Sequence, residues 1–180
     1  MLPDTTEVLI IGAGPTGMAL SIVLHRAGVD HVLIDKLAQG LQTSRAGVIH
    51  AQTLETLEPL GVTQRLSELA LKLQNFAIRD RNRALLKLDF SKLPSKHPYL
   101  MMLPQNLTEQ VFAERIAALG GVIHRMVEAK AVIQDADGAR VTGGREWPRE
   151  TDIGTLCRWC RRHEQPGAQV DRHRVRRRGL

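Results

Sequence analysis

The sequence predicts an α/β fold in which a parallel sheet is flanked by helices, and three observations lead to this prediction. A short apolar run at residues 8–11 ends in the glycine-rich turn Gly-Ala-Gly-Pro-Thr-Gly at residues 12–17. A helical segment follows the turn, and a second apolar run then ends in an acid. The 180 residues, 43% of them hydrophobic, suffice for one domain with a core and are too few for two full-sized domains.

The first strand is predicted over residues 8–11, because four consecutive apolar residues are typical of a strand buried on both faces and too few for a helix. The following helix is predicted over residues 18–27, closed by Gly28, since glycine readily takes the left-handed conformation that ends helices. The second strand is predicted over residues 31–34, with Asp35 at its end.

Each part of this unit suits the binding of a dinucleotide. Gly12 allows a tight turn, Gly14 lets the backbone approach a pyrophosphate, and Gly17 lets the helix pack close to the strand. The unpaired N–H groups at the helix start favour phosphates. Asp35, 18 residues beyond Gly17, can accept both hydrogen bonds of an adenosine ribose, and its charge would repel a 2′-phosphate. FAD or NAD is therefore favoured over NADP.

A glycine-rich turn alone would fit a purely structural role equally well, but the strand, helix and spaced acid together predict a dinucleotide site. These residues do not decide between FAD and NAD. The candidate cofactor-binding residues of this unit are Gly12, Gly14, Pro15, Thr16, Gly17, Asp35 and Lys36.

The middle of the chain predicts a mixture of helices and antiparallel strands. A packing helix is predicted over residues 51–60, with Gly61 as its stop. Residues 76–90 alternate around a polar turn at 80–82, with Leu86, Leu88 and Phe90 on one face, and this pattern predicts a hairpin.

The remainder of the body continues the same mixture. An apolar strand at residues 99–103 is broken by Pro104, and Asn106 is predicted to cap the next helix, with Glu109 three residues later. That helix ends before the glycines at 120–121. Strands are then predicted over 122–125, 129–134 and 139–141, the last two joined by a turn at 137–138.

Four segments together resemble a known family. They are residues 12–17, Ser-Arg-Ala-Gly-Val-Ile-His-Ala at 44–51, Thr-Leu-Glu at 53–55 and Tyr-Leu-Met-Met-Leu-Pro-Gln at 99–105. In this order they resemble the amino-terminal part of FAD-dependent aromatic-ring monooxygenases, the group typified by para-hydroxybenzoate and phenol hydroxylases. The resemblance covers residues 7–142 approximately. It implies a partial Rossmann-like FAD-binding domain, a parallel sheet with helices plus an antiparallel hairpin layer.

The resemblance also implies two further cofactor-binding residues. The family arginine that matches Arg45 lies against the phosphate and ribityl region of the cofactor, and the glutamine that matches Gln105 contacts FAD from a neighbouring strand. From the residues alone, Arg45 fits an exposed loop arginine and Gln105 fits a lead-in to a helix equally well. Gln52 departs from the family, which usually has arginine there, and His50 and His97 are interpreted as structural.

The activity implied by the resemblance is aromatic hydroxylation. NAD(P)H would reduce bound FAD, and O₂ would then supply an oxygen atom to a small phenolic substrate. No catalytic side chain is predicted, because family members continue with a second flavin-binding segment and a substrate-binding sheet. Two alternatives stay open: a truncated product without catalysis, and another FAD- or NAD-dependent oxidoreductase such as a reductase.

The composition changes abruptly near residue 143, so the chain is divided into an FAD-binding part at 1–142 and a tail at 143–180. Residues 145–180 hold 10 Arg, no Lys and both cysteines. A zinc site would use the cysteines with His163 and His173, and an arginine-rich segment could bind nucleic acid. Neither is favoured, because there is no second Cys-x-x-Cys, no Lys and no folded platform.

The favoured interpretation of the tail is a shift of reading frame between Val141 and Trp147. Read one base later, permitted codons for residues 157–168 yield Val-Val-Gly-Ala-Asp-Gly-Met-Ser-Ser-Arg-Val-Arg, which resembles the family at this place. The tail is predicted to be disordered, since its few apolar residues cannot offset the entropy of ordering it. With no long apolar run and no basic leader, the protein is expected to be cytoplasmic, without a membrane partner.

Overall fold

The computed structural model describes residues 2–40, 47–81, 83–134, 139–143 and 151–157. The chain divides into two compact units. The first unit comprises Met1–Ala13, Leu24–Gln39 and Val122–Leu180, and the second comprises Gly14–Val23 and Gly40–Gly121. Helix α1 (Pro15–Arg26) contributes residues to both units.

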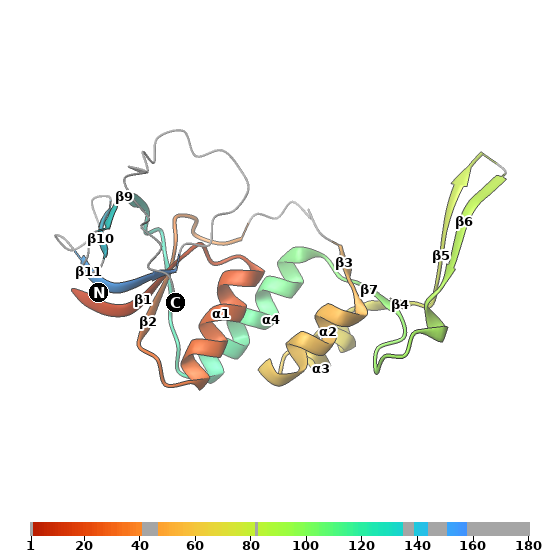
Figure 1. The fold of residues 1–180 in the computed structure, drawn as a ribbon, viewed down its shortest axis with the longest axis horizontal. Helices are drawn as coiled ribbons and strands as arrows, with labels where there is room; N and C mark the ends of the chain where they lie inside the picture. Colours follow the sequence, from red (N-terminus) through yellow and green to blue (C-terminus); the bar gives the residue numbers. More distant parts are fainter. Residues whose placement is uncertain (1, 41–46, 82, 135–138, 144–150, 158–180) are drawn as a thin grey trace, which may run out of the picture. The chain divides into compact units, whose positions relative to one another are not determined.

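The first unit is built on a six-stranded sheet with the strand order β8-β2-β1-β11-β10-β9. Figure 1 shows the red strand β1 beside the blue strand β11. Strands β8, β2, β1 and β11 run parallel to one another. Strand β10 is antiparallel to β11, and β9 is antiparallel to β10. The bounds are β1 Thr5–Ile11, β2 His31–Asp35, β8 Ile123–Arg125, β9 Ala129–Gln134, β10 Ala139–Gly143 and β11 Thr151–Cys157. The predicted strands of this unit and its parallel arrangement are confirmed.

The core of the first unit lies between residues that are far apart in sequence. Leu9, Val32, Ile34 and Val141 are each at most 7% exposed and belong to one apolar cluster. In β1, Leu9 and Ile10 are both buried, so the strand is covered on both faces. The continuous apolar run that predicted this strand therefore has the expected physical cause.

Strand β11 lies within the tail that is predicted to be disordered. Thr151–Cys157 pairs in parallel with β1 and antiparallel with β10. These 7 residues can pair there because the edge of β1 offers backbone hydrogen-bonding groups, and the disorder of the tail as a whole stays a prediction. Residues 144–150 and 158–180 lie outside the described part of the chain, and so do Trp147, Cys160, His163 and His173.

The second unit combines helices with short antiparallel strands. A three-stranded sheet has the order β3-β7-β4, and β5 and β6 form a separate two-stranded hairpin. Its remaining bounds are β3 Val48–Ile49, α2 Ala51–Leu57, η1 Glu58–Leu60, α3 Thr63–Leu69, β4 Leu71–Leu73, β5 Asn75–Asp80, β6 Arg83–Asp89, η2 Phe90–Lys92, β7 Leu100–Met102 and α4 Gln105–Ala118. The predicted helices, hairpin and apolar strand of this region are confirmed, whereas β3, β4 and α3 were not predicted.

The ends of the helices show where local sequence rules held and where they did not. The predicted stop at Gly61 is confirmed, since this residue has a φ of +74° and Arg115 Nε donates to the carbonyl of Leu60 at 3.0 Å. The prediction that Asn106 caps α4 is wrong. The Pro104 carbonyl already accepts the N–H of Leu107 at 3.0 Å, so the helix begins earlier and Asn106 lies in its first turn.

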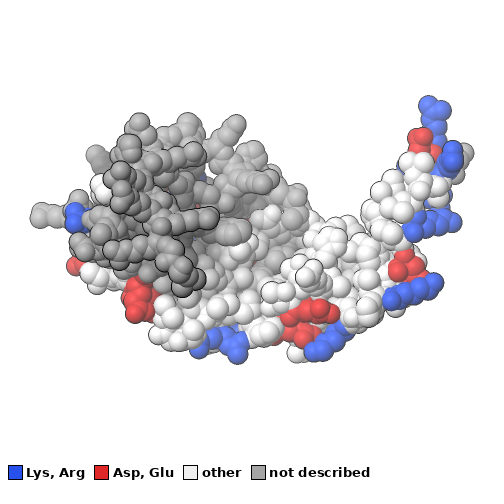
Figure 2. All heavy atoms as spheres, in the orientation of Figure 1, with Lys and Arg blue, Asp and Glu red and all other residues white. Residues whose placement is uncertain are grey.

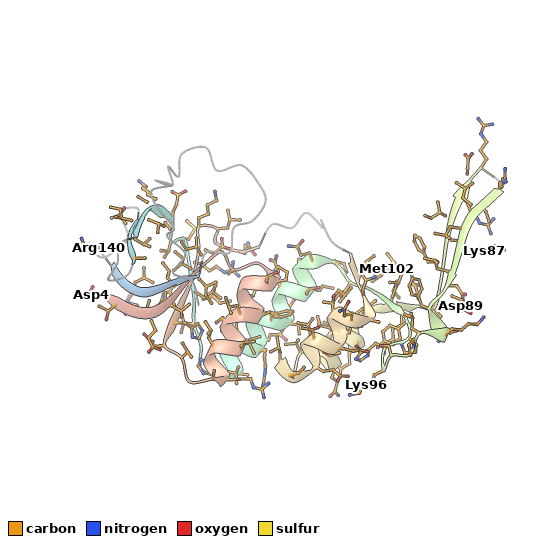
Figure 3. The ribbon with its side chains drawn as sticks, in the orientation of Figure 1. Asp4, Lys87, Asp89, Lys96, Met102 and Arg140 are labelled. Carbon is orange, nitrogen blue, oxygen red and sulfur yellow. The ribbon has the colours of Figure 1, made fainter. Side chains whose placement is uncertain are left out.

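The β5–β6 hairpin carries an apolar face that nothing in the described residues covers. Phe76 pairs with Leu88 and Ile78 with Leu86, and all four are 40–45% exposed. Lys87 and Asp89, marked in Figure 3, alternate with the leucines and therefore lie on the opposite face. Figure 2 shows several Lys and Arg side chains gathered over this hairpin.

A polar cluster joins η1 to the segment before β7. Glu58 Oε2 accepts from Lys96 Nζ at 3.0 Å, and Glu58 Oε1 lies 2.9 Å from His97 Nε2. The other ring nitrogen of His97 lies 3.1 Å from the Tyr99 hydroxyl. These contacts agree with the structural role inferred for His97.

The Glu58 cluster predicts a measurable sensitivity to acid. The hydrogen bond from Lys96 is the main cause that holds the pKa of Glu58 below its usual 4.5, and His97 adds to it. Because the pKa is depressed on folding, the stabilisation is present above the unfolded pKa and is lost as the pH falls through the folded pKa. Glu58→Gln and Lys96→Met should each flatten the dependence of the unfolding free energy on pH below 4.5, measured by urea denaturation. An unchanged slope in both variants contradicts this assignment.

No helix in the described ranges is both long and apolar enough to cross a membrane.

Candidate nucleotide-binding site

The turn after β1 has the geometry that only glycine adopts easily. Gly12 has a φ of +110°, in a region that residues with a Cβ seldom occupy. Its N–H donates to the carbonyl of Ile34 at 2.8 Å, which ties the end of β1 to the end of β2. The next residue, Ala13, is fully buried. The turn is therefore held in one conformation at the carboxyl end of the sheet.

Asp35 ends β2 beside this turn. Its side chain is 6% exposed, and its Oδ2 accepts the backbone N–H of Ala13 at 2.8 Å. Its Oδ1 accepts the N–H of Leu37 at 2.9 Å. A carboxylate can accept about four hydrogen bonds, so both oxygens keep room for a ligand hydroxyl. Lys36 follows directly and is exposed.

Helix α1 begins at the fourth position of the glycine-rich turn. Pro15 is its first residue, a position where proline loses no hydrogen bond, and Met18 N–H donates to the Gly14 carbonyl at 3.0 Å. Gly14 and Gly17 are buried, whereas Thr16 is exposed. The first N–H groups of the helix have no partner within it and carry its partial positive charge, which suits an anionic group.

Arg125 is a candidate that the sequence analysis missed. It ends β8, and the register of the parallel pair places it opposite Asp35, with Arg125 Nη1 at 3.8 Å from Asp35 Oδ2. Burial lowers the pKa of the neighbouring His124. The one available signal for Arg125 was its place at the end of a predicted strand.

Gln105 belongs to the second unit, where it is the first residue of α4. Its Nε2 donates to Glu109 Oε1 at 2.7 Å, and Glu109 is 5% exposed. Gly40 lies so close to the Glu109 carboxylate that a Cβ at this position would collide with it. The buried acid therefore holds the amide nitrogen of Gln105. Arg45 lies outside the described residues.

The described residues hold no group of three or more His, Cys, Asp or Glu side chains that could bind a metal ion. The first unit thus gathers Gly12, Ala13, Asp35 and Arg125 at the carboxyl ends of three adjacent parallel strands, β8, β2 and β1. In open α/β sheets this edge is where ligands bind.

Comparison with known proteins gives a consistent result. A sequence family described as FAD binding domain matches residues 5–152. The 12-dehydrotetracycline 5-monooxygenase/anhydrotetracycline 6-monooxygenase of Streptomyces rimosus is 36% identical over 153 residues, which are 83% of this chain and 29% of that protein. Pentachlorophenol 4-monooxygenase of Sphingobium chlorophenolicum is 38% identical over 112 residues, 62% of this chain and 21% of that protein. The chain thus spans less than a third of these relatives.

Solved structures agree with the sequence relatives. OxyS anhydrotetracycline hydroxylase from Streptomyces rimosus superimposes with a TM-score of 0.75 at 34% identity, covering 86% of this chain and 31% of that one. p-Nitrophenol 4-monooxygenase PnpA from Pseudomonas putida has a TM-score of 0.78 at 22% identity, covering 87% and 41% of the two chains, and this likeness concerns the fold.

Proposed function

Since the chain belongs to the FAD binding domain family, we propose that it is the amino-terminal part of a flavoprotein monooxygenase that hydroxylates small aromatic, phenolic compounds with NAD(P)H and O₂. The sequence relatives support this proposal, because their names describe monooxygenases of 12-dehydrotetracycline, anhydrotetracycline and pentachlorophenol. Dinucleotide reductases that share the glycine-rich turn are less well supported by these relatives.

One observation carries the cofactor assignment. The Asp35 carboxylate is buried and fixed at 2.8 Å from the Ala13 N–H, in the turn after the first strand. A carboxylate in this place can accept hydrogen bonds from the ribose hydroxyls, and the amides of the turn and of the α1 start can hold a pyrophosphate. The residues proposed to bind FAD are Gly12, Gly14, Pro15, Thr16, Gly17, Asp35, Lys36, Arg45 and Gln105.

The chain's own residues supply position and charge. Bound FAD supplies the redox chemistry that activates O₂. Asp35 would orient the adenosine ribose, and the glycine turn would fix the pyrophosphate. Gln105 would present its carbonyl oxygen, since its amino group is already held by Glu109 at 2.7 Å. A carbonyl oxygen accepts hydrogen bonds, so the matching partner is an N–H or O–H group of the cofactor.

Titration of the purified chain with FAD tests the cofactor assignment. We expect quenching or anisotropy of flavin fluorescence to saturate, and a flavin absorption band to stay with the protein through gel filtration. Riboflavin lacks the adenosine diphosphate portion of FAD. It should bind more weakly, because the described site residues of the first unit are proposed to bind that portion. Failure of FAD to bind overturns the proposal.

A second measurement tests the reaction. NADH and NADPH oxidation should be followed with and without a panel of phenols, together with hydroxylated product by mass spectrometry. Phenol-dependent oxidation with product supports a monooxygenase. Oxidation that ignores the phenols points to a reductase, and flavin binding without oxidation assigns the chain to cofactor binding alone.

A further inference from the structure

Arg125 has a charge partner but lacks a hydrogen-bond acceptor at its buried nitrogen. Its Nη1 is buried and makes no hydrogen bond among the described residues, although the side chain as a whole is 24% exposed. The 3.8 Å between Nη1 and Asp35 Oδ2 exceeds the roughly 2.7 to 3.2 Å of an N–H···O hydrogen bond. A guanidinium is always charged, so an unmade hydrogen bond at a buried N–H is unfavourable and calls for a missing acceptor.

Asp35 is not that acceptor in the structure, because its Oδ2 lies 3.8 Å from Arg125 Nη1. Its Oδ2 is held by the Ala13 N–H at 2.8 Å and its Oδ1 by the Leu37 N–H at 2.9 Å. These two backbone donors fix the carboxylate in place. A third group that donates to Asp35 Oδ2 and accepts from Arg125 Nη1 would satisfy both atoms.

A hydroxyl group has this property. An oxygen about 2.7 Å from Oδ2 and about 2.9 Å from Nη1 closes a triangle on the 3.8 Å separation, with an angle of about 85° at the hydroxyl. The site stands at the carboxyl edge of β2 and β8, where the ribose of an adenine dinucleotide is expected.

We propose that Arg125 is a further cofactor-binding residue, which donates from Nη1 to a ribose hydroxyl oxygen of the adenosine while that hydroxyl donates to Asp35 Oδ2. The proposal rests on the proposed function, because it needs an adenosine ribose at this site. Arg125 and Asp35 would then together select a hydroxyl group, because a hydroxyl both donates and accepts a hydrogen bond. An adenine nucleotide that lacks this hydroxyl should therefore bind with lower affinity, because it loses a hydrogen bond to each of the two residues.

Competition against bound FAD tests the proposal with ADP, 2′-deoxy-ADP and 3′-deoxy-ADP. In the wild-type chain, one of the two deoxy compounds should bind much more weakly than ADP. Arg125→Met should lower the affinity for ADP by about tenfold, which is the effect of one hydrogen bond to a charged group. The ratio between the affinities for ADP and for that deoxy compound, the deoxy penalty, should fall by the same factor. Arg83→Met removes an exposed arginine of the hairpin and serves as the control, with wild-type affinities expected.

The size of the deoxy penalty separates recognition from a merely structural role. If Arg125 only stabilised the fold, Arg125→Met would lower the affinities for ADP and for the deoxy compound by the same factor. The ratio of the two affinities would then stay unchanged. Arg125→Lys keeps the positive charge without the planar fork, so it should also shrink the penalty and covers the case in which the methionine variant does not fold. Circular dichroism establishes which variants are folded.

Two negative results have different meanings. A wild-type chain that binds neither FAD nor ADP overturns the proposed function and this proposal with it. A wild-type chain that binds both, with a deoxy penalty that neither Arg125 variant alters, overturns the role of Arg125 alone.

Discussion

Replacing Asp35 with alanine is expected to weaken FAD binding by at least about a hundredfold, because two hydrogen bonds from the ribose to a charged group are lost. The same change removes the acceptor of the Ala13 and Leu37 N–H groups, which lie 2.8 and 2.9 Å from the carboxylate. Leaving one buried and one part-buried donor unsatisfied should lower the free energy of unfolding by about 1 to 5 kcal/mol. Fluorescence titration measures the first effect and urea denaturation the second.

Two further variants make the Asp35 result specific. Asp35→Asn preserves the shape but can accept through one oxygen only, so its FAD affinity should fall between the wild type and the alanine variant. Asp30→Ala removes an exposed aspartate from the same unit and should bind FAD as the wild type does. FAD affinity that is unchanged in a folded Asp35→Ala variant would show that the cofactor does not use this carboxylate.

Replacing Gly12 with alanine is expected to damage both the fold and the cofactor site. Its φ of +110° is strained for any residue with a Cβ, at a cost of about 1 to 3 kcal/mol. If the turn relaxes to relieve the strain, the Gly12 N–H moves from the Ile34 carbonyl, now 2.8 Å away, and the neighbouring amides move as well. FAD affinity should then fall by about tenfold or more.

The matched control for Gly12 is Gly47→Ala. An added Cβ at Gly47 meets no atom within 4 Å, so its melting temperature and FAD affinity should stay at the wild-type values. Thermal denaturation followed by circular dichroism compares the two variants. Equal melting temperatures for Gly12→Ala and the wild type would contradict the strain argument.

The sequence predicted the elements whose causes are local. The apolar run of β1, the glycine that closes α1 and the hairpin at β5–β6 each follow from short patterns, and the structure has all three. Asp35 was placed correctly beside the turn because the strand–turn–helix–strand spacing determines where the second strand ends. In contrast, Asn106 was misjudged because Pro104 competes for the start of the same helix.

Features that depend on distant pairing were not predictable from local patterns. Arg125 meets Asp35 only because β8 pairs with β2, although 90 positions separate the two residues in sequence. Likewise, β11 forms by pairing with the edge of β1 and not through its own apolar content. The shift of reading frame between Val141 and Trp147 stays a prediction, which DNA sequencing of the gene tests; an unrelated or closed alternative frame would refute it.

The position of β1 between β2 and β11 has a consequence for synthesis on the ribosome. β1 is made first, and β2 can pair with it early, but about 115 residues separate β2 from β11 in the chain. At a synthesis rate of about 5 to 20 residues per second, the edge of β1 that pairs with β11 stays unpaired for about 6 to 23 s. During that interval the nascent chain exposes an unpaired apolar strand edge, so its yield in cells should depend on chaperone capacity.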